Sequence, residues 1–278
     1  MQCDLDSATI HYQERGGGRP IVFLHGWTLD HRLELVDYEP IFEARAGWRR
    51  LYPDLPGMGR SIAKEGLASQ DDVLSAVLAF VDHVVGSERF VLAGTSLGAY
   101  LARAVAVRRR AQVAGLLLRL PCVIADTAKR TLPPFEPLVR NDALLGEIPD
   151  EERAALGNVL IQTPDYLAAA RRKSRSLFQP AITATAPIAH AIRADPKRYA
   201  FSFDLPSEEQ GFTAPALIIA GRQDTTVGYR DALAILESYP RATFAVLDGV
   251  DHGWPVEAPN LLAPLLDDWL RRIALAEG

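Results

Sequence analysis

Residues 90–98 read Phe-Val-Leu-Ala-Gly-Thr-Ser-Leu-Gly, and this stretch decides the fold. Its first four residues form a continuous apolar run, which is typical of a strand buried on both faces. A helical pattern follows from Leu97 to Arg109, so the chain turns from strand to helix at Ser96. Such a turn exposes the serine hydroxyl at the carboxyl end of a sheet, and the flanking glycines let it close without Cβ clashes. The stretch therefore predicts a nucleophilic serine; the alternative is that Ser96 only caps the helix.

The rest of the chain alternates apolar runs with helical patterns. Further strands are predicted at Thr9–Arg15, Ile21–Leu24, Trp48–Tyr52, Gly115–Leu120, Ala216–Ala220 and Thr243–Leu247. Apolar residues at helical spacing predict helices over Asp71–Val85 and in the segment after Pro259. Because strands and helices alternate, we expect an α/β fold whose mostly parallel sheet carries helices on both faces.

One region interrupts this alternation. Residues 123–212 contain no convincing strand, but Thr163-Pro164 is typical of a helix N-terminus, and the helix that it opens should reach about Phe178. We therefore predict a core formed by residues 1–122 and 213–278, with residues 123–212 inserted as a helical cap over one end of the sheet. The cap is expected to line an apolar substrate pocket, with candidate lining residues Phe135, Leu138, Tyr166 and Phe178. The alternative is that these side chains form the cap's own small core.

Composition narrows the class of protein. The chain has 278 residues, of which 48% are hydrophobic and 23% charged, so it is a folded globular protein. A net charge of −5 provides no chain-wide basic field for nucleic acid or anionic lipid. The two cysteines, Cys3 and Cys122, form neither a disulfide framework nor a metal-binding pattern. We expect a cytoplasmic protein without signal peptide or membrane span, a monomer or homodimer whose partner is a small-molecule substrate.

A nucleophilic serine needs a base, and the base needs an orienting acid. His252 follows the last predicted strand, where a histidine can reach the carboxyl end of the sheet. Asp224 follows the strand Ala216–Ala220 and precedes His252, in the chain order Ser…Asp…His. Asp126 is the alternative acid, whereas Asp251 is too close to His252 in the chain to orient its ring. We predict Ser96, Asp224 and His252 as the catalytic residues.

The oxyanion that forms during such catalysis needs two N–H donors. One is the backbone N–H of Leu97, directly after the nucleophile. The other is expected from the loop His25-Gly26-Trp27, after the strand Ile21–Leu24, and we choose the backbone N–H of Trp27. His25 is placed beside the substrate, where it is expected to brace this loop rather than to transfer protons.

Together these motifs resemble the α/β-hydrolase fold superfamily across nearly the whole chain. They are His25-Gly26-Trp27, Asp54-Leu55-Pro56-Gly57-Met58-Gly59-Arg60-Ser61, the turn at Ser96, Gly221-Arg222-Gln223-Asp224 and Asp251-His252-Gly253. The resemblance implies an eight-stranded, mostly parallel sheet, a helical cap between its sixth and seventh strands, and catalysis through an acyl-enzyme without cofactor or metal. Haloalkane dehalogenases and soluble epoxide hydrolases share the layout but use an aspartate nucleophile, and Ser96 sets them aside. Esterases of the His-Gly-Gly-Gly type are disfavoured because Trp27 follows Gly26.

The expected function is that of a serine hydrolase acting on a small to medium carboxylic ester or thioester. One alternative keeps the triad but cleaves a carbon–carbon bond or acts as a lyase, with a cap arginine or Arg119 beside a substrate carboxylate. Another alternative is a non-catalytic small-molecule binder of the same fold. The basic run at residues 171–175 is interpreted as a solvated helix face.

Overall fold

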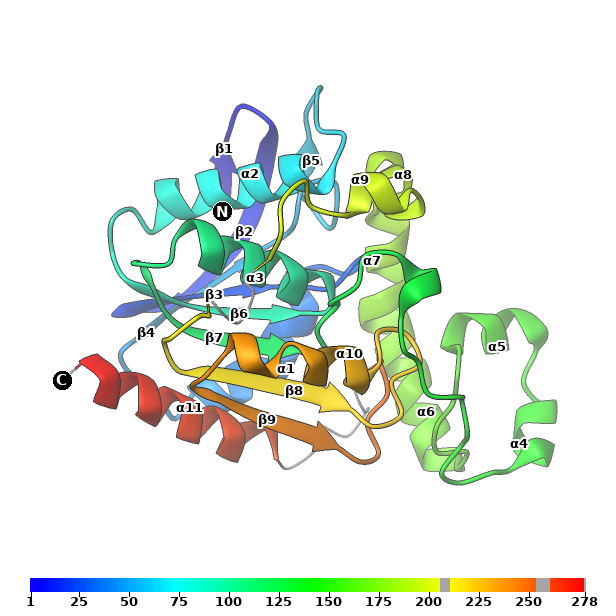
Figure 1. The fold of residues 1–278 in the computed structure, drawn as a ribbon. Coiled ribbons are helices and arrows are strands. Elements are labelled where there is room, and N and C mark those ends of the chain that lie inside the picture. Colours follow the sequence, from blue (N-terminus) through cyan, green and yellow to red (C-terminus); the bar gives the residue numbers. More distant parts are fainter. Residues whose placement is uncertain (206–210, 254–260, 278) are drawn as a thin grey trace.

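The computed structural model describes residues 1–205, 211–253 and 261–277, and its centre is one twisted sheet with helices on both faces (Figure 1). Across the sheet the strands follow the order β1 (Gln2–Asp4), β2 (Ala8–Gly16), β4 (Trp48–Pro53), β3 (Arg19–Leu24), β6 (Phe90–Thr95), β7 (Val113–Arg119), β8 (Ala216–Gly221) and β9 (Ala242–Leu247). A short ninth strand, β5 (Ile62–Ala63), pairs with β2. Pairing is parallel from β4 to β9 and antiparallel at β1 and β2, which confirms the predicted mostly parallel sheet.

Strand β3 shows why the apolar runs are continuous. Its successive side chains point to opposite faces of the sheet. Ile21 and Phe23 pack in the core on one face, and Val22 and Leu24 pack in the core on the other. Both faces are covered, so an alternating polar residue would be buried without a partner.

Different helices complete the two cores. Helices α1 (His31–Phe42) and α11 (Leu262–Glu277) cover one face, and α2 (Gln70–Val84), α3 (Leu97–Arg108) and α10 (Tyr229–Ala234) cover the other. Helix α2 begins with a capping box in which Ser69 and Asp72 bond each other's backbone N–H. The sequence pattern predicted α2, α3 and α11 but not α1, because the buried face of α1 includes the polar residues His31 and Glu34.

The chain between β7 and β8 is helical. It contains α4 (Asp142–Gly146), α5 (Asp150–Leu156), α6 (Pro164–Lys173), α7 (Gln179–Ala184), α8 (Pro187–Ala194) and α9 (Pro196–Tyr199). As predicted, Thr163 caps α6 with Pro164 at its first position, and a π-helical turn at Ser174–Phe178 joins α6 to α7. Figure 1 shows this inserted helical region beyond the arrowheads of β8 and β9, that is, at the carboxyl ends of the strands. No helix in the described ranges combines the length and the apolarity that crossing a membrane requires.

Candidate active site

The turn between β6 and α3 holds Ser96 in a strained conformation. Its φ of 54° lies in the left-handed region, which is uncommon for a residue with a side chain. The flanking glycines are required by close backbone contacts. A Cβ atom on Gly98 would lie 1.9 Å from the carbonyl oxygen of Leu24, and one on Gly94 would lie 2.3 Å from the carbonyl oxygen of Gly98. The turn therefore presses tightly against β3 and fixes the position of the serine hydroxyl.

Ser96, His252 and Asp224 form one chain of hydrogen bonds. The Oγ of Ser96 lies 3.0 Å from Nε2 of His252, and Nδ1 of His252 lies 2.9 Å from Oδ2 of Asp224. Asp224 is buried, and its Oδ1 accepts the backbone N–H groups of Thr226 and Val227 at 2.8 and 2.9 Å. Burial opposes ionisation of Asp224, but His252 and these two N–H donors outweigh it, so the pKa of the carboxyl is lowered. The ionised carboxylate then requires a proton on Nδ1 of His252, which leaves Nε2 free to accept the Ser96 hydroxyl proton.

The two other carboxylates near this chain have different partners. Asp126, the alternative acid, caps a short 3-10 turn by accepting the backbone N–H of Ala128 at 3.1 Å. Asp251 accepts the backbone N–H of Gly253 at 2.9 Å, within its own loop. The residues that follow, including Trp254 and Pro255, lie outside the described residues. Of the three candidate acids, the structure brings Asp224 to His252.

The start of α3 and the loop after β3 meet at Ser96. Leu97 is the first residue of α3, where an N–H has no partner within the helix. The loop after β3 also approaches the serine, since a Cβ atom on Gly26 would lie 3.5 Å from the Cβ of Ser96. Trp27 is next in this loop and lines the same cavity as Ser96. Neither the Trp27 N–H nor the Leu97 N–H donates a hydrogen bond within the described ranges.

His25 lies buried behind this loop and does not line the cavity. This corrects the prediction that His25 lies beside the substrate, while its expected role as a brace of the loop is retained. Its side chain is fully buried. Its Nδ1 donates to the carbonyl oxygen of Gly26 at 2.7 Å, and its Nε2 accepts the backbone N–H of Leu55 at 2.8 Å. Burial lowers the pKa of this imidazole, which favours the neutral form that these two bonds require.

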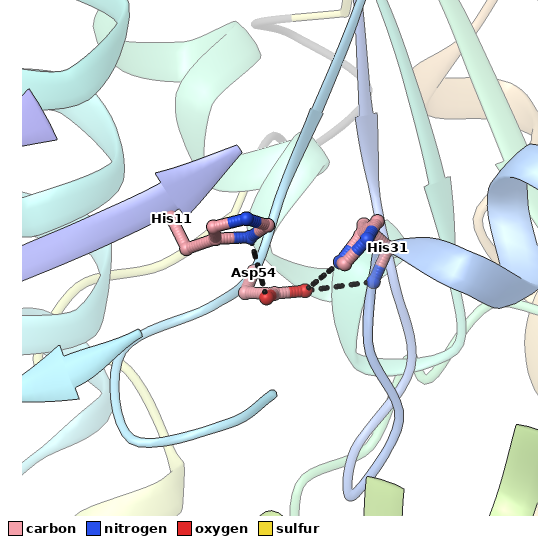
Figure 2. Close-up of side chains that lie close together, drawn as sticks. All are labelled: His11, His31 and Asp54. Atoms are coloured by element: carbon pink, nitrogen blue, oxygen red, sulfur yellow. Dashed lines mark hydrogen bonds and ion pairs between the residues drawn. The ribbon is translucent and has the colours of Figure 1, made fainter. Parts of the chain in front are cut away.

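Figure 2 shows a second polar cluster, in which Asp54 lies between His11 and His31. The Nδ1 atoms of the two rings lie 3.1 and 2.7 Å from the carboxylate oxygens of Asp54, which also accept the backbone N–H groups of His31 and Arg60. Although burial opposes it, hydrogen bonds and attraction from His31 help to lower the pKa of Asp54 to about 2. The Nε2 of His31 lies 3.2 Å from the amide nitrogen of Gln13.

Among the described residues, His11, His31 and Asp54 are also the one group of three side chains spaced to hold a metal ion. The two carboxylate oxygens of Asp54 already accept four N–H groups. Two of these are the Nδ1–H groups of His11 and His31, and two are backbone N–H groups. Metal binding would require all three groups to give up these bonds. We therefore interpret the cluster as a brace that ties β2, α1 and the loop after β4 together.

The triad faces a cavity of about 380 Å³, a size suited to a small molecule. Loops at the strand ends supply part of its wall, and the inserted helices supply the rest through Phe178, Ile182, Arg193 and Tyr199. Phe178 was predicted here. Tyr166 instead lines a neighbouring cavity of about 60 Å³, which shares Phe178 and Gly253 with the larger one.

Phe135 and Leu138 are not among the residues that line the cavity, which corrects their prediction as pocket residues. Leu138 is 48% exposed, and its backbone N–H bonds the carbonyl oxygen of Leu160, within the inserted region. The cavity residues Arg130, Arg193 and Tyr199 were not predicted from the sequence, because no local pattern shows which inserted residues turn toward the core.

The basic run at residues 171–175 is only partly a solvated face. Arg172 and Arg175 are exposed, but Arg171 pairs with Glu152, and Lys173 donates to the carbonyl oxygen of Gly253 at 3.0 Å. Lys173 thereby connects α6 to the loop that carries His252.

A scan against family models matches residues 21–265 to the model described as the alpha/beta hydrolase family. Among curated proteins, haloalkane dehalogenase 2 of Mycobacterium tuberculosis is 34% identical over 119 residues, 41% of this chain and 39% of the dehalogenase, so the match spans well under half of that relative. The 2-hydroxy-6-oxononadienedioate/2-hydroxy-6-oxononatrienedioate hydrolase of Paraburkholderia phymatum is 26% identical over 94% of this chain and 90% of its own length. Among solved structures, an alpha/beta superfamily hydrolase from Oenococcus oeni superposes with a TM-score of 0.78 at 25% identity, over 99% of both chains.

Proposed function

Because this chain belongs to the alpha/beta hydrolase family, we propose that it is a serine hydrolase that cleaves a small to medium carboxylic ester or thioester. The observation that carries the proposal is the hydrogen-bonded chain Ser96–His252–Asp224 at the edge of a partly enclosed cavity. A seryl hydroxyl bonded to an imidazole that is itself oriented by a buried carboxylate is an activated nucleophile.

In the proposed reaction, Oγ of Ser96 attacks the ester carbonyl while Nε2 of His252 takes its proton. Asp224 keeps the imidazole in the required tautomer and stabilises the imidazolium. The N–H groups of Trp27 and Leu97 bind the oxyanion, each worth about 3 kcal/mol. His252 then protonates the leaving alcohol or thiol, which breaks the ester bond and leaves an acyl group on Ser96. Water activated by His252 attacks this acyl group and releases the acid.

A fluorophosphonate probe tests the nucleophile directly. Intact and peptide masses should show one stoichiometric adduct on Ser96 in the native protein, and none in Ser96→Ala of unchanged melting temperature. A panel of methyl and ethyl esters and thioesters then defines the substrate. A folded protein that forms no adduct and hydrolyses no ester would contradict the proposal and would favour the small-molecule binder.

A second candidate is hydrolysis of a carbon–carbon bond with the same triad. The near full-length similarity to the Paraburkholderia phymatum hydrolase favours it. A carbon–carbon hydrolase should prefer a vinylogous diketone to a simple ester, so comparing kcat/KM for the two classes separates the candidates. In both reactions Ser96→Ala should abolish turnover.

A further inference from the structure

The cavity at Ser96 is lined by two arginines whose charge no carboxylate compensates. They are Arg130, which follows β7, and Arg193, on α8. Neither makes an ion pair with an acidic side chain in the ranges that the structure describes, and no Asp or Glu of these ranges lines the cavity. Both arginines are half-buried. Uncompensated positive charge in a partly enclosed site attracts an anionic group.

Arg193 is held in place with most of its donors open. Its Nη2 donates to Oγ1 of Thr127 at 2.9 Å. The guanidinium carbon lies 4.7 Å from the ring centre of Tyr199 and 5.7 Å from that of Trp27. A guanidinium has five N–H donors, and the bond to Thr127 uses one of them. Because the aromatic rings fix its plane in advance, little side-chain entropy remains to be lost when it binds a planar anion.

Arg130 contributes its positive charge to the cavity, but several of its N–H donors already have partners in the protein. Its guanidinium donates to the carbonyl oxygens of Ile124 and Thr226 at 2.9 and 2.8 Å, and to Sγ of Cys122 at 3.3 Å. Carbonyl oxygens satisfy these donors without cancelling the charge. Burial raises the pKa of the Cys122 thiol despite the two arginines, so the sulfur supplies no negative charge either.

A third arginine at the cavity, Arg119, does have its charge balanced by carboxylates. Arg119 is fully buried, and its guanidinium pairs with Glu34 at 2.9 Å and Asp37 at 2.5 Å. Its charge is therefore balanced within the protein. This corrects the alternative in which Arg119 receives a substrate carboxylate, and it leaves that position to Arg193 and Arg130.

We propose that the substrate carries a carboxylate away from its scissile carbonyl, and that the guanidinium fork of Arg193 binds this carboxylate while Arg130 adds to the attraction. The inference rests on the proposed function, because it names the substrate class of the same site. Bidentate pairing of Arg with a carboxylate is short and directional, so this contact selects charged esters over neutral ones of equal length.

Two pairs of esters test the preference. In the first pair, monomethyl adipate carries a carboxylate at the end of its acyl half, where methyl hexanoate carries a methyl group. In the second pair, the acetyl ester of 4-hydroxybutyrate carries a carboxylate at the end of its alcohol half, where butyl acetate carries a methyl group. We expect kcat/KM to favour the charged ester in one of the pairs by about 10-fold or more. Monomethyl esters of succinate to suberate then measure the distance between the carboxylate and the scissile carbonyl.

Arg193→Gln should lower kcat/KM for the preferred charged ester at least about 10 times more than for its neutral partner. Arg172→Gln is the matched control: it removes the same charge from an exposed position of the inserted region and should change neither value. Equal losses on both esters in Arg193→Gln, or a preference for the neutral ester in both pairs at every length, would overturn the proposal.

A binding measurement separates this proposal from the proposed function. Adipate, for the acyl half, and 4-hydroxybutyrate, for the alcohol half, are titrated calorimetrically into Ser96→Ala. At least one should bind, and its affinity should fall about 10-fold or more in Ser96→Ala/Arg193→Gln. Circular dichroism checks that both variants are folded. If either acid binds in this Arg193-dependent way but no ester is hydrolysed, the anion site stands and the esterase proposal fails. If esters are hydrolysed but neither acid binds, the anion site is wrong.

Discussion

The Nδ1 atom of His252 lies 2.9 Å from the Oδ2 atom of Asp224, across 28 residues of chain. The other carboxylate oxygen, Oδ1, is held by the backbone N–H groups of Thr226 and Val227. The carboxylate is thus fixed by its own loop before it orients the imidazole.

Asp224→Asn tests this relationship. The amide keeps the shape of the carboxylate but no longer requires the proton on Nδ1 of His252. The proton can then lie on Nε2, which could no longer accept the Ser96 hydroxyl proton. We expect kcat on the best ester to fall on the order of 10⁴-fold with a small change in KM. Asp251→Asn, one residue from His252, should lower kcat less than about 10-fold. Equal losses in the two variants would mean that Asp224 is not the orienting acid.

Gly98→Ala tests the packing of the turn at Ser96. The new Cβ would lie 1.9 Å from the carbonyl oxygen of Leu24 and 2.7 Å from that of His25, and these backbone atoms cannot move aside as a flexible side chain could. We expect the free energy of unfolding to fall by about 3 kcal/mol or more, measured by urea titration. Gly17→Ala is the control, because a Cβ there would meet no atom within 4 Å; it should change stability by less than about 0.5 kcal/mol.

Features set by short stretches of sequence were predictable. The strands of the parallel sheet, the cap of α6 and the turn at Ser96 each depend on neighbouring residues. Sequence order also placed His252 and Asp224, because the carboxyl ends of parallel strands meet at one edge. The edge strands β1 and β5 have three and two residues, too few to show a period.

The wall of the cavity was less predictable, because it depends on how the inserted helices pack. Phe178 lines the cavity as expected, whereas Leu138 lies in an exposed segment. Arg193 follows an ordinary helical pattern, and only its position against Tyr199 and Trp27 shows which way it faces. His25 was correctly expected to brace its loop, but its full burial needed the structure.

Stability should depend on pH through Asp54. Its pKa of about 2 in the folded protein lies below the ordinary value of 3.8. The folded state therefore holds fewer protons, so this contribution is present above about pH 4 and is lost as the pH falls toward 2. Asp54→Asn lacks the titration, so its stability deficit against the native protein should narrow by about 2 kcal/mol between pH 5 and pH 2. Parallel urea-unfolding curves across this range would contradict the prediction.

His25→Phe should impair catalysis and stability together. The ring roughly preserves volume but leaves the Leu55 N–H buried without a partner, at a cost of about 1–3 kcal/mol. The Gly26 carbonyl loses the His25 bond and keeps only the backbone N–H of Leu29 at 3.2 Å. Because Gly26 precedes Trp27, the proposed oxyanion donor moves as well, and kcat should fall more than KM rises. Thermal melting and ester kinetics measure the two effects. A variant that melts lower yet keeps the native kcat would show that the brace does not position Trp27.

Arg119→Met tests the buried ion pairs behind the cavity. Glu34 and Asp37 are 1% and 7% exposed at their side chains, and Arg119 is their shared counter-ion. Removing Arg119 leaves two buried carboxylates without their ion-pair partner, so we expect a loss of about 3–5 kcal/mol in the free energy of unfolding. Arg109→Met is the matched control, since Arg109 pairs with the half-exposed Asp82 at the surface; it should cost less than about 1 kcal/mol. If Arg119→Met instead kept its stability and lost only the preference for charged esters, Arg119 rather than Arg193 would be the substrate's cation.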